Sequence, residues 1–135
     1  MRHRRSLLLF LASSLTVAAL GCSDNSGPSN PRPPAATYTM TSFQNPPNPV
    51  LTPPTATGTL VLAATTYNVT INVQGQDPVT DQGTYTISGN NWSQTSTTNQ
   101  GVQSTGTYTY NESTGVLTVD VTAFGVRTIS AWQKQ

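Results

Sequence analysis

The chain has 135 residues, only 8% of them charged, and a formal net charge of +1 at pH 7. Three of its six basic residues lie before residue 22, so the remainder carries three basic against five acidic residues, a net charge of about −2. No basic patch remains of the kind that nucleic-acid binding requires, and the length leaves room for one domain. A single cysteine excludes an intrachain disulfide.

The first 22 residues have the pattern of an export signal. Residues 1–5 (MRHRR) are basic, and residues 7–20 form an apolar run. This run is shorter than the roughly 20 residues that a membrane-spanning helix needs, and it has the length of a signal-peptide core. The small residues Ala18, Ala19 and Gly21 then precede Cys22. An ordinary secreted protein, cleaved nearby with Cys22 as a bystander, is the alternative.

The segment before Cys22 resembles the lipobox of bacterial lipoproteins. The resemblance implies that residues 1–21 are a signal peptide and that Cys22 is the lipid-attachment site. Its thiol would carry a diacylglycerol, and the membrane would be a partner through that lipid. Two or three acyl chains anchor a protein stably, whereas one is marginal. We therefore expect a cell-envelope protein, with Ser23 after the cysteine favouring the outer membrane and the domain in the periplasm or at the surface.

Residues 22–36 are expected to form a disordered tether. They contain four prolines among small polar residues, a composition that buries too little surface to fold and favours extended polyproline II. At about 3.1 Å per residue, such a spacer could reach roughly 40 Å.

From residue 37 onward the sequence alternates with a period of two and shows no helical periodicity. Abundant threonine favours strands, because β-branched side chains suit a pleated surface. We predict a β domain over residues 37–133 with eight strands at residues 38–43, 57–63, 67–73, 82–88, 91–97, 102–110, 116–121 and 126–132.

Short connections between these strands predict antiparallel neighbours. Gly58, Gly83 and Gly106 recur near the start of three hairpins, each followed by threonine. A glycine at such a position often marks a bulge or bend, which helps a sheet to close. In the loop at residues 45–54, Val50 and Leu51 could plug a barrel, or the loop could be a stiff surface connection.

Alternation also predicts which side chains face inward. The last strand is ambiguous, because Val126 and Trp132 compete with Ile129 and Ala131 for the interior. The predicted inward set elsewhere is Leu60, Leu62, Tyr67, Val69, Ile71, Val73, Tyr85, Ile87, Tyr108, Tyr110, Leu117, Val119 and Val121.

The phrase GTYT at residues 83–86 and again at residues 106–109 resembles secreted lipocalin-like β-barrel lipoproteins. The resemblance implies an antiparallel eight-stranded up-and-down barrel. The Gly-x-Trp signature of true lipocalins is missing from the first strand, where residues 40–43 stand instead. A β-sandwich is the alternative, although a meander without a long crossover fits it less well.

Catalytic chemistry has little support in the sequence. The only histidine, His3, lies in the signal peptide, and the only cysteine is the lipid-attachment residue. Triads that depend on histidine, thiolate catalysis and zinc sites built on His or Cys are therefore excluded. Asp77 and Asp81 are interpreted as solvated turn residues, with a weak Ca²⁺ site as the remaining option. Asp120 alternates with inward residues and should face water. We therefore expect that the protein is not an enzyme and that it binds no metal ion or cofactor.

Aromatic side chains give the one indication of a ligand site. They would project into the barrel and either line an apolar pocket or fill the interior completely. The first outcome predicts binding of a small apolar ligand, and the second a non-catalytic structural or protein-interaction module. The candidate ligand-binding residues are Tyr38, Tyr67, Tyr85, Trp92, Tyr108 and Tyr110.

Overall fold

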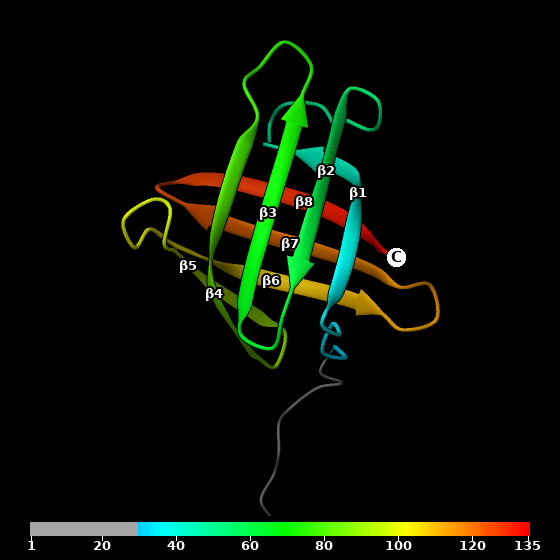
Figure 1. Cartoon of the computed structure of the whole chain (residues 1–135), viewed down its shortest axis with the longest axis vertical. Helices are drawn as coiled ribbons and strands as arrows, with labels where there is room; N and C mark the ends of the chain where they lie inside the picture. Colours follow the sequence, from blue (N-terminus) through cyan, green and yellow to red (C-terminus); the bar gives the residue numbers. More distant parts are fainter. Residues whose placement is uncertain (1–29) are drawn as a thin grey trace, which may run out of the picture.

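The structure, a computed structural model, describes residues 30–135, so the expected signal peptide and Cys22 lie outside the described residues. Eight strands make up this part of the chain (Figure 1). They are β1 (Ala36–Gln44), β2 (Ala56–Leu62), β3 (Thr66–Val73), β4 (Val79–Ser88), β5 (Asn91–Ser96), β6 (Gln103–Asn111), β7 (Val116–Ala123) and β8 (Val126–Lys134).

Each strand pairs antiparallel with the next, and β1 also pairs with β8, which closes the sheet into a barrel. The predicted up-and-down barrel is therefore confirmed, and the β-sandwich alternative is wrong. All eight predicted strands occur, with β4 starting three residues earlier than expected and β8 ending two residues later. Within residues 30–135, no helix is long and apolar enough to cross a membrane.

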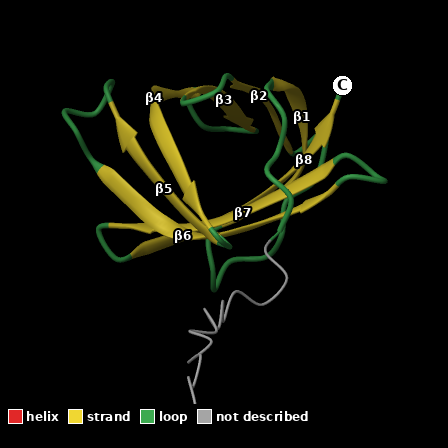
Figure 2. Ribbon diagram, turned by 90° about the horizontal axis from the view of Figure 1, so that it is seen from below, coloured by secondary structure: helices red, strands yellow, loops and turns green. Residues whose placement is uncertain are grey.

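The barrel is flattened into two layers that cross at a steep angle. Strands β2 to β4 run steeply in front, and β6 to β8 cross behind them (Figure 1). Figure 2 shows β2 and β3 on one side of the interior and β6 and β7 on the other. Strand β1 joins the layers, pairing with β2 up to Thr39 and with β8 up to Gln44, with a register shift between Met40 and Ser42. A bulge of this kind lets one strand bend from one layer to the other.

Two of the recurring glycines bring neighbouring strands unusually close together. A Cβ on Gly83 would lie 1.9 Å from the carbonyl oxygen of Thr95, and one on Gly106 would lie 1.9 Å from that of Asp120. No side chain fits at these distances, so the close approach of the strands requires glycine. The pairing register is continuous through both glycines, and the bulge lies instead between Met40 and Ser42.

The interior follows the predicted alternation. All the predicted inward residues belong to the core or pack against it. In β8 the even-numbered residues face inward, with Trp132 and Ser130 both buried, whereas Val126 at the strand's start is exposed. Sequence alternation did not identify Met40 and Ala56, which are also fully buried.

Residues 30–35 lie against the barrel, although they were assigned to the tether. Asn30 donates from its amide nitrogen to Tyr108 O (2.8 Å) and from its backbone to Asn90 Oδ1 (2.8 Å). Pro33 is fully buried, and strand β1 already begins at Ala36. The ordered domain therefore starts earlier than predicted.

The two ends of the barrel are named by their connections. The closed end carries residues 30–35 and the turns at residues 63–65, 89–90 and 112–115. The open end carries the connections at residues 45–55, 74–78, 97–102 and 124–125. At the open end, Leu51 pairs with Phe43 through two backbone hydrogen bonds of 2.9 and 2.8 Å, whereas Val50 is exposed. Val50 therefore does not plug the barrel, whereas Leu51 is partly buried and packs against the core.

Candidate functional site

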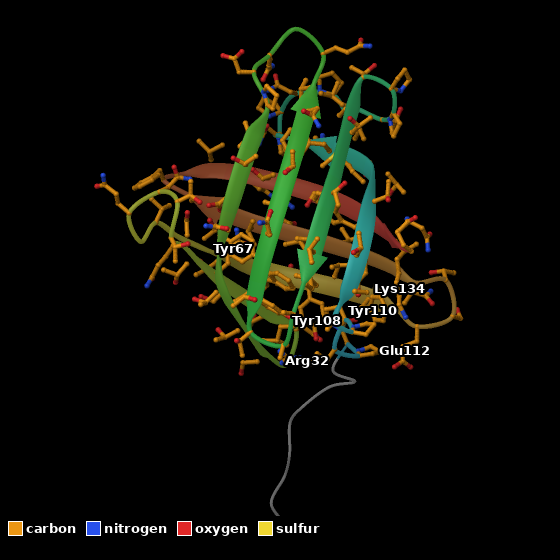
Figure 3. All side chains as sticks on the ribbon, viewed as in Figure 1. Arg32, Tyr67, Tyr108, Tyr110, Glu112 and Lys134 are labelled. Carbon is orange, nitrogen blue, oxygen red and sulfur yellow. The ribbon has the colours of Figure 1, made fainter. Side chains whose placement is uncertain are left out.

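Aromatic rings fill the closed end of the barrel. Tyr85 stacks on Trp92 with 4.7 Å between ring centroids, and Trp92 meets Tyr108 at 6.0 Å in a tilted arrangement. Such pairs add roughly 0.5–1.5 kcal/mol each beyond the burial of their area. Figure 3 shows Tyr108 and Tyr110 at this end, near Arg32. The rings therefore form a packed plug.

The tyrosine hydroxyls at this end, including that of Tyr38, donate hydrogen bonds to residues 30–35 and to the adjacent turn. Tyr38 donates to Pro34 O (2.8 Å), Tyr85 to Ala63 O (2.7 Å) and Tyr108 to Asn30 O (3.0 Å). Buried hydroxyls are costly unless they are paired, so these bonds make a fully buried ring tolerable here. Burial raises the pKa of Tyr38 and of Tyr108 above the ordinary tyrosine value.

The positively charged side chain of Arg32 lies over the rings at the closed end. Its guanidinium lies 5.7 Å from the Tyr85 ring centroid and donates to Ala64 O at 2.5 Å. A guanidinium over an aromatic face is attracted by the ring's quadrupole. Arg32 therefore belongs to the cap of the closed end.

A cavity of about 100 Å³, the inner cavity, lies deeper in the barrel. Its walls are mostly apolar, and both tryptophans of the chain contact it. The lining residues are Leu60, Tyr67, Val69, Ile71, Trp92, Gln94, Val119, Val121, Thr128, Ser130 and Trp132.

A second hollow of about 280 Å³, the outer chamber, lies at the open end. It shares Ile71 and Thr128 with the inner cavity, and Phe43, Val73 and Asp77 also contact it. Small-molecule sites usually measure roughly 300–1,000 Å³, so neither hollow alone reaches that size. Because they share two wall residues, the two hollows are adjacent to each other at Ile71 and Thr128.

The polar groups of the inner cavity are fixed by the tryptophans. Trp92 Nε1 donates to Gln94 Oε1, and Trp132 Nε1 donates to Ser130 Oγ, both at 2.8 Å. An indole N–H can only donate, so Gln94 must present its oxygen to Trp92 and keeps its NH₂ group for other partners. The Ser130 hydroxyl likewise keeps its proton.

A polar network stands behind the cavity wall at Tyr67. The Tyr67 hydroxyl donates to Asp81 Oδ2 at 2.7 Å, and Ser96 Oγ donates to the other carboxylate oxygen. Asp81 pairs across strands with inward-facing Val69, so it lies on the inner face. Burial, together with the neighbouring Asp81 carboxylate, raises the pKa of the Tyr67 hydroxyl.

Of the six candidate ligand-binding residues, only Tyr67 and Trp92 contact the inner cavity. The other four, Tyr38, Tyr85, Tyr108 and Tyr110, point inward and are buried as predicted, but they lie at the closed end and do not line the inner cavity. Three of them bond residues 30–35 or a turn through their hydroxyls. Tyr110 belongs to the same core and also borders the recess beside residues 112–115. The predicted set thus combined two regions with different roles.

The acidic residues also fall into different settings. Asp81 is not a solvated turn residue, because it lies on strand β4 and faces inward. Asp77 contacts the outer chamber. Among the residues that the structure describes, no cluster of three or more metal-ligating side chains occurs.

Asp120 faces outward, as expected, and pairs there with Arg127. The guanidinium binds both carboxylate oxygens, at 2.9 and 2.6 Å. The hydrogen bonds from Arg127 lower the pKa of Asp120. This pair neutralises both charges on the outer surface.

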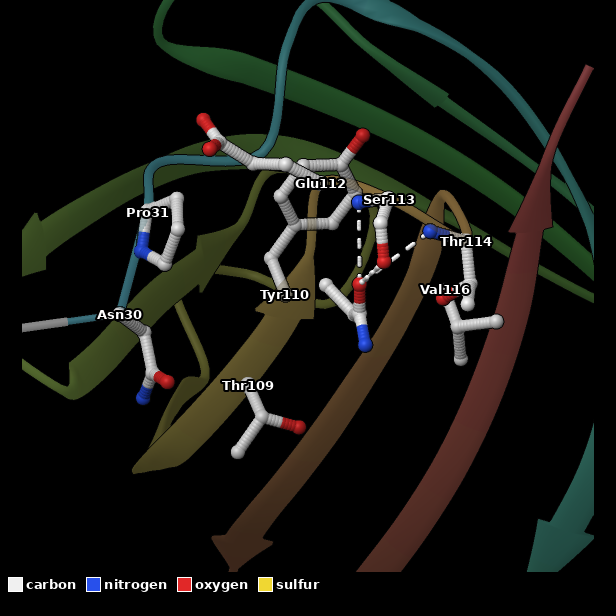
Figure 4. A pocket seen from close by; sticks show the side chains of 9 residues that line it. Asn30, Pro31, Thr109, Tyr110, Glu112, Ser113, Thr114 and Val116 are labelled. Carbon is white, nitrogen blue, oxygen red and sulfur yellow. Dashed lines mark hydrogen bonds between the residues drawn. The ribbon is translucent and has the colours of Figure 1, made fainter.

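A broad recess of about 830 Å³ lies beside the turn at residues 112–115 (Figure 4). Its polar groups already bond one another, because Asn111 Oδ1 accepts from Ser113 N, Ser113 Oγ and Thr114 N. The recess is widely open to solvent, so it lacks the enclosure typical of ligand sites. The inner cavity is the stronger candidate despite its smaller volume.

Sequence reasoning missed the polar residues of the inner cavity: Gln94, Thr128 and Ser130. Gln94 lies two residues after Trp92 on the same strand, so period-two alternation from Trp92 could have found it. Thr128 and Ser130 required a decision on the face of the last strand, which the sequence left open.

No protein-family model matches the chain, and no curated protein matches it. Among solved structures, the barrel is similar to a mutant of the fluorescent protein UnaG, with a TM-score of 0.41 and 12% sequence identity. The similarity covers 75% of this chain and 95% of that one.

Proposed function

We propose that this protein is a lipid-anchored protein of the bacterial cell envelope that binds a small apolar ligand in its barrel, without catalysing a reaction. The observation that supports binding is the inner cavity, which is mostly apolar, contacts both tryptophans and is adjacent to the outer chamber at Ile71 and Thr128. A few polar groups in an otherwise apolar hollow are typical of sites that orient a small ligand.

The small volume limits what the inner cavity can hold. An apolar cavity of roughly 150 Å³ accommodates a single benzene ring, so about 100 Å³ suits a short alkyl end or part of a ring. The remainder of the ligand would occupy the outer chamber, which adds about 280 Å³.

The position of the chain's N-terminal side supports the combination of an anchor with a binding site. Asn30 bonds the closed end of the barrel, opposite the open end. A lipid on Cys22 would hold the protein from the closed side and leave the mouth accessible. The anchor itself rests on the lipobox resemblance and on the basic and apolar segments before Cys22.

Ligand binding can be tested on the mature chain, residues 22–135, with Cys22→Ser to remove the lipid. We expect native mass spectrometry to detect a co-purifying small molecule after expression in a bacterial host. Val69→Phe places a larger side chain in the inner cavity and should abolish retention. Val61→Phe is the matched control, because Val61 is exposed on the outer surface.

A filled, non-binding barrel would give the opposite pattern. If the protein retains nothing and Val69→Phe leaves the spectrum and the urea midpoint unchanged, the interaction-module alternative replaces the binding proposal.

The anchor needs a separate experiment on the full chain. In a bacterial host supplied with a clickable fatty acid, we expect the protein to be labelled, and Cys22→Ala to lose the label. Globomycin should cause the uncleaved precursor to accumulate. Processing that continues unaltered with globomycin would refute lipidation while leaving the ligand site untouched.

A further inference from the structure

The charged side chains of residues 30–135 are distributed unevenly around the hollow interior. Asp81 lies on the inner face behind Tyr67, and Asp77 contacts the outer chamber. None of the three cations in this part of the chain contacts either hollow. Arg32 caps the closed end, Arg127 is bound to Asp120, and Lys134 ends strand β8. The two hollows therefore have two carboxylates near them, and none of these three cations contacts them.

The hydrogen-bond donors that line the inner cavity and remain available to a ligand are uncharged. Gln94 keeps its NH₂ group after accepting from Trp92, and Ser130 keeps its hydroxyl proton after accepting from Trp132. The Gln94 NH₂ group has two hydrogens and also bonds the Tyr67 hydroxyl, so its second hydrogen and the Ser130 proton are the ones available to a ligand. Both groups can donate to a carbonyl or hydroxyl oxygen on a ligand.

From these observations we infer that the ligand is an uncharged amphiphile, with an apolar end in the inner cavity and a hydrogen-bond acceptor facing Gln94 and Ser130. A carboxylate-bearing ligand such as a free fatty acid is excluded by the same site. This inference rests on the proposed ligand-binding function and specifies the chemical class of the ligand.

The physical reason is the cost of placing an anion in this interior. A charge removed from water needs an opposite charge or several hydrogen bonds to offset its lost hydration. Here an anion would meet only uncharged donors while lying near Asp77 and Asp81, whose negative charges repel it through a medium less polarisable than water. An alcohol or ketone of the same chain length meets none of these costs.

The test compares 1-octanol, 2-octanone and octanoate, which have the same chain length and differ in the polar group. The mature chain with Cys22→Ser is titrated at pH 7 and low salt, and binding is followed by intrinsic fluorescence. Both tryptophans contact the inner cavity, so a ligand there changes the signal. We expect the two neutral ligands to bind at least about tenfold more tightly than octanoate.

Three variants identify the source of this discrimination. Asp81→Asn and Asp77→Asn should each strengthen octanoate binding by about threefold or more, with octanol binding unchanged. Asp77 is a loop residue, so its variant remains informative if Asp81→Asn disturbs the network with Tyr67 and Ser96. Glu112→Gln removes a negative charge at the closed end and should leave the ratio unaltered.

The outcomes separate the two proposals. If octanoate binds as tightly as octanol, or more tightly, the inference on ligand class is overturned while ligand binding stands. If none of the three ligands changes the fluorescence and native mass spectrometry detects no retained molecule, the binding function fails and the inference fails with it.

Discussion

The closed and open ends of the barrel are built on the same strands, yet one is packed and the other is hollow. At the closed end, inward positions hold rings such as Tyr85 and Tyr108, which bury nearly all of their surface. At the open end, inward positions hold the smaller Ile71, Val121 and Thr128, which are only partly buried. Large rings fill an eight-stranded barrel, whereas short side chains leave space between its walls. Side-chain volume along the barrel axis thus determines which end of the interior is hollow.

The largest effect should come from emptying the closed end. Tyr108→Ala removes a ring that is 2% exposed and should lower the free energy of unfolding by about 3–5 kcal/mol. Ile71→Ala at the open end should cost only about 1 kcal/mol, because this side chain already borders empty space. Urea unfolding measures both. Equal losses would mean that the open end is packed as tightly as the closed end.

A second contrast concerns the two kinds of glycine. Gly106→Ala would place a methyl group against the carbonyl of Asp120 and should lower stability by about 3 kcal/mol. Gly75→Ala, in the turn at the open end, meets open space but requires a left-handed residue at φ +79°, so a loss of about 1 kcal/mol is expected. If Gly75→Ala were the more damaging, close strand approach would not be what selects glycine at residue 106.

Alkaline pH should weaken the barrel through the buried tyrosine hydroxyls. Burial raises the folded-state pKa of Tyr38, Tyr67 and Tyr108, so each hydroxyl holds its proton longer in the folded state. Their contribution is complete below the ordinary tyrosine pKa of about 10 and is lost as the pH rises above it, because unfolding then releases protons. The urea midpoint should fall between pH 9 and pH 11. An unchanged midpoint would show that these hydroxyls titrate normally.

Tyr67→Phe provides the control for that measurement at the boundary between the two ends. It removes one of the titrating groups and should flatten the alkaline decline. It also leaves Asp81 with one hydrogen bond fewer, so a modest loss of about 1 kcal/mol is expected at pH 7.

Strand order and inward faces were predictable from the sequence because both depend on local alternation and short turns. The division of the interior into a packed closed end and a hollow open end was not predictable, because it depends on which inward residues lie at the same height in the barrel. Tyr67 and Tyr85 lie on adjacent strands, yet only Tyr67 contacts the inner cavity. Residues 30–35 were misassigned for a related reason: their proline-rich composition is typical of a spacer, and only the folded barrel provides the partners of Asn30 and the burial of Pro33.

The last prediction is a gain in stability at the rim of the open end. Phe124 and Gly125 form the two-residue turn between β7 and β8, and both have positive φ, at 50° and 76°. A phenylalanine in the left-handed region is strained, and its side chain is 87% exposed, so no burial offsets the strain. Phe124→Asn gives the Asn-Gly pair that such turns favour and should stabilise the protein by about 1 kcal/mol, measured by urea unfolding. Phe124→Ala, which keeps the strain, should give no such gain. A loss of stability in Phe124→Asn would instead show that the exposed ring contributes a contact at the mouth of the barrel.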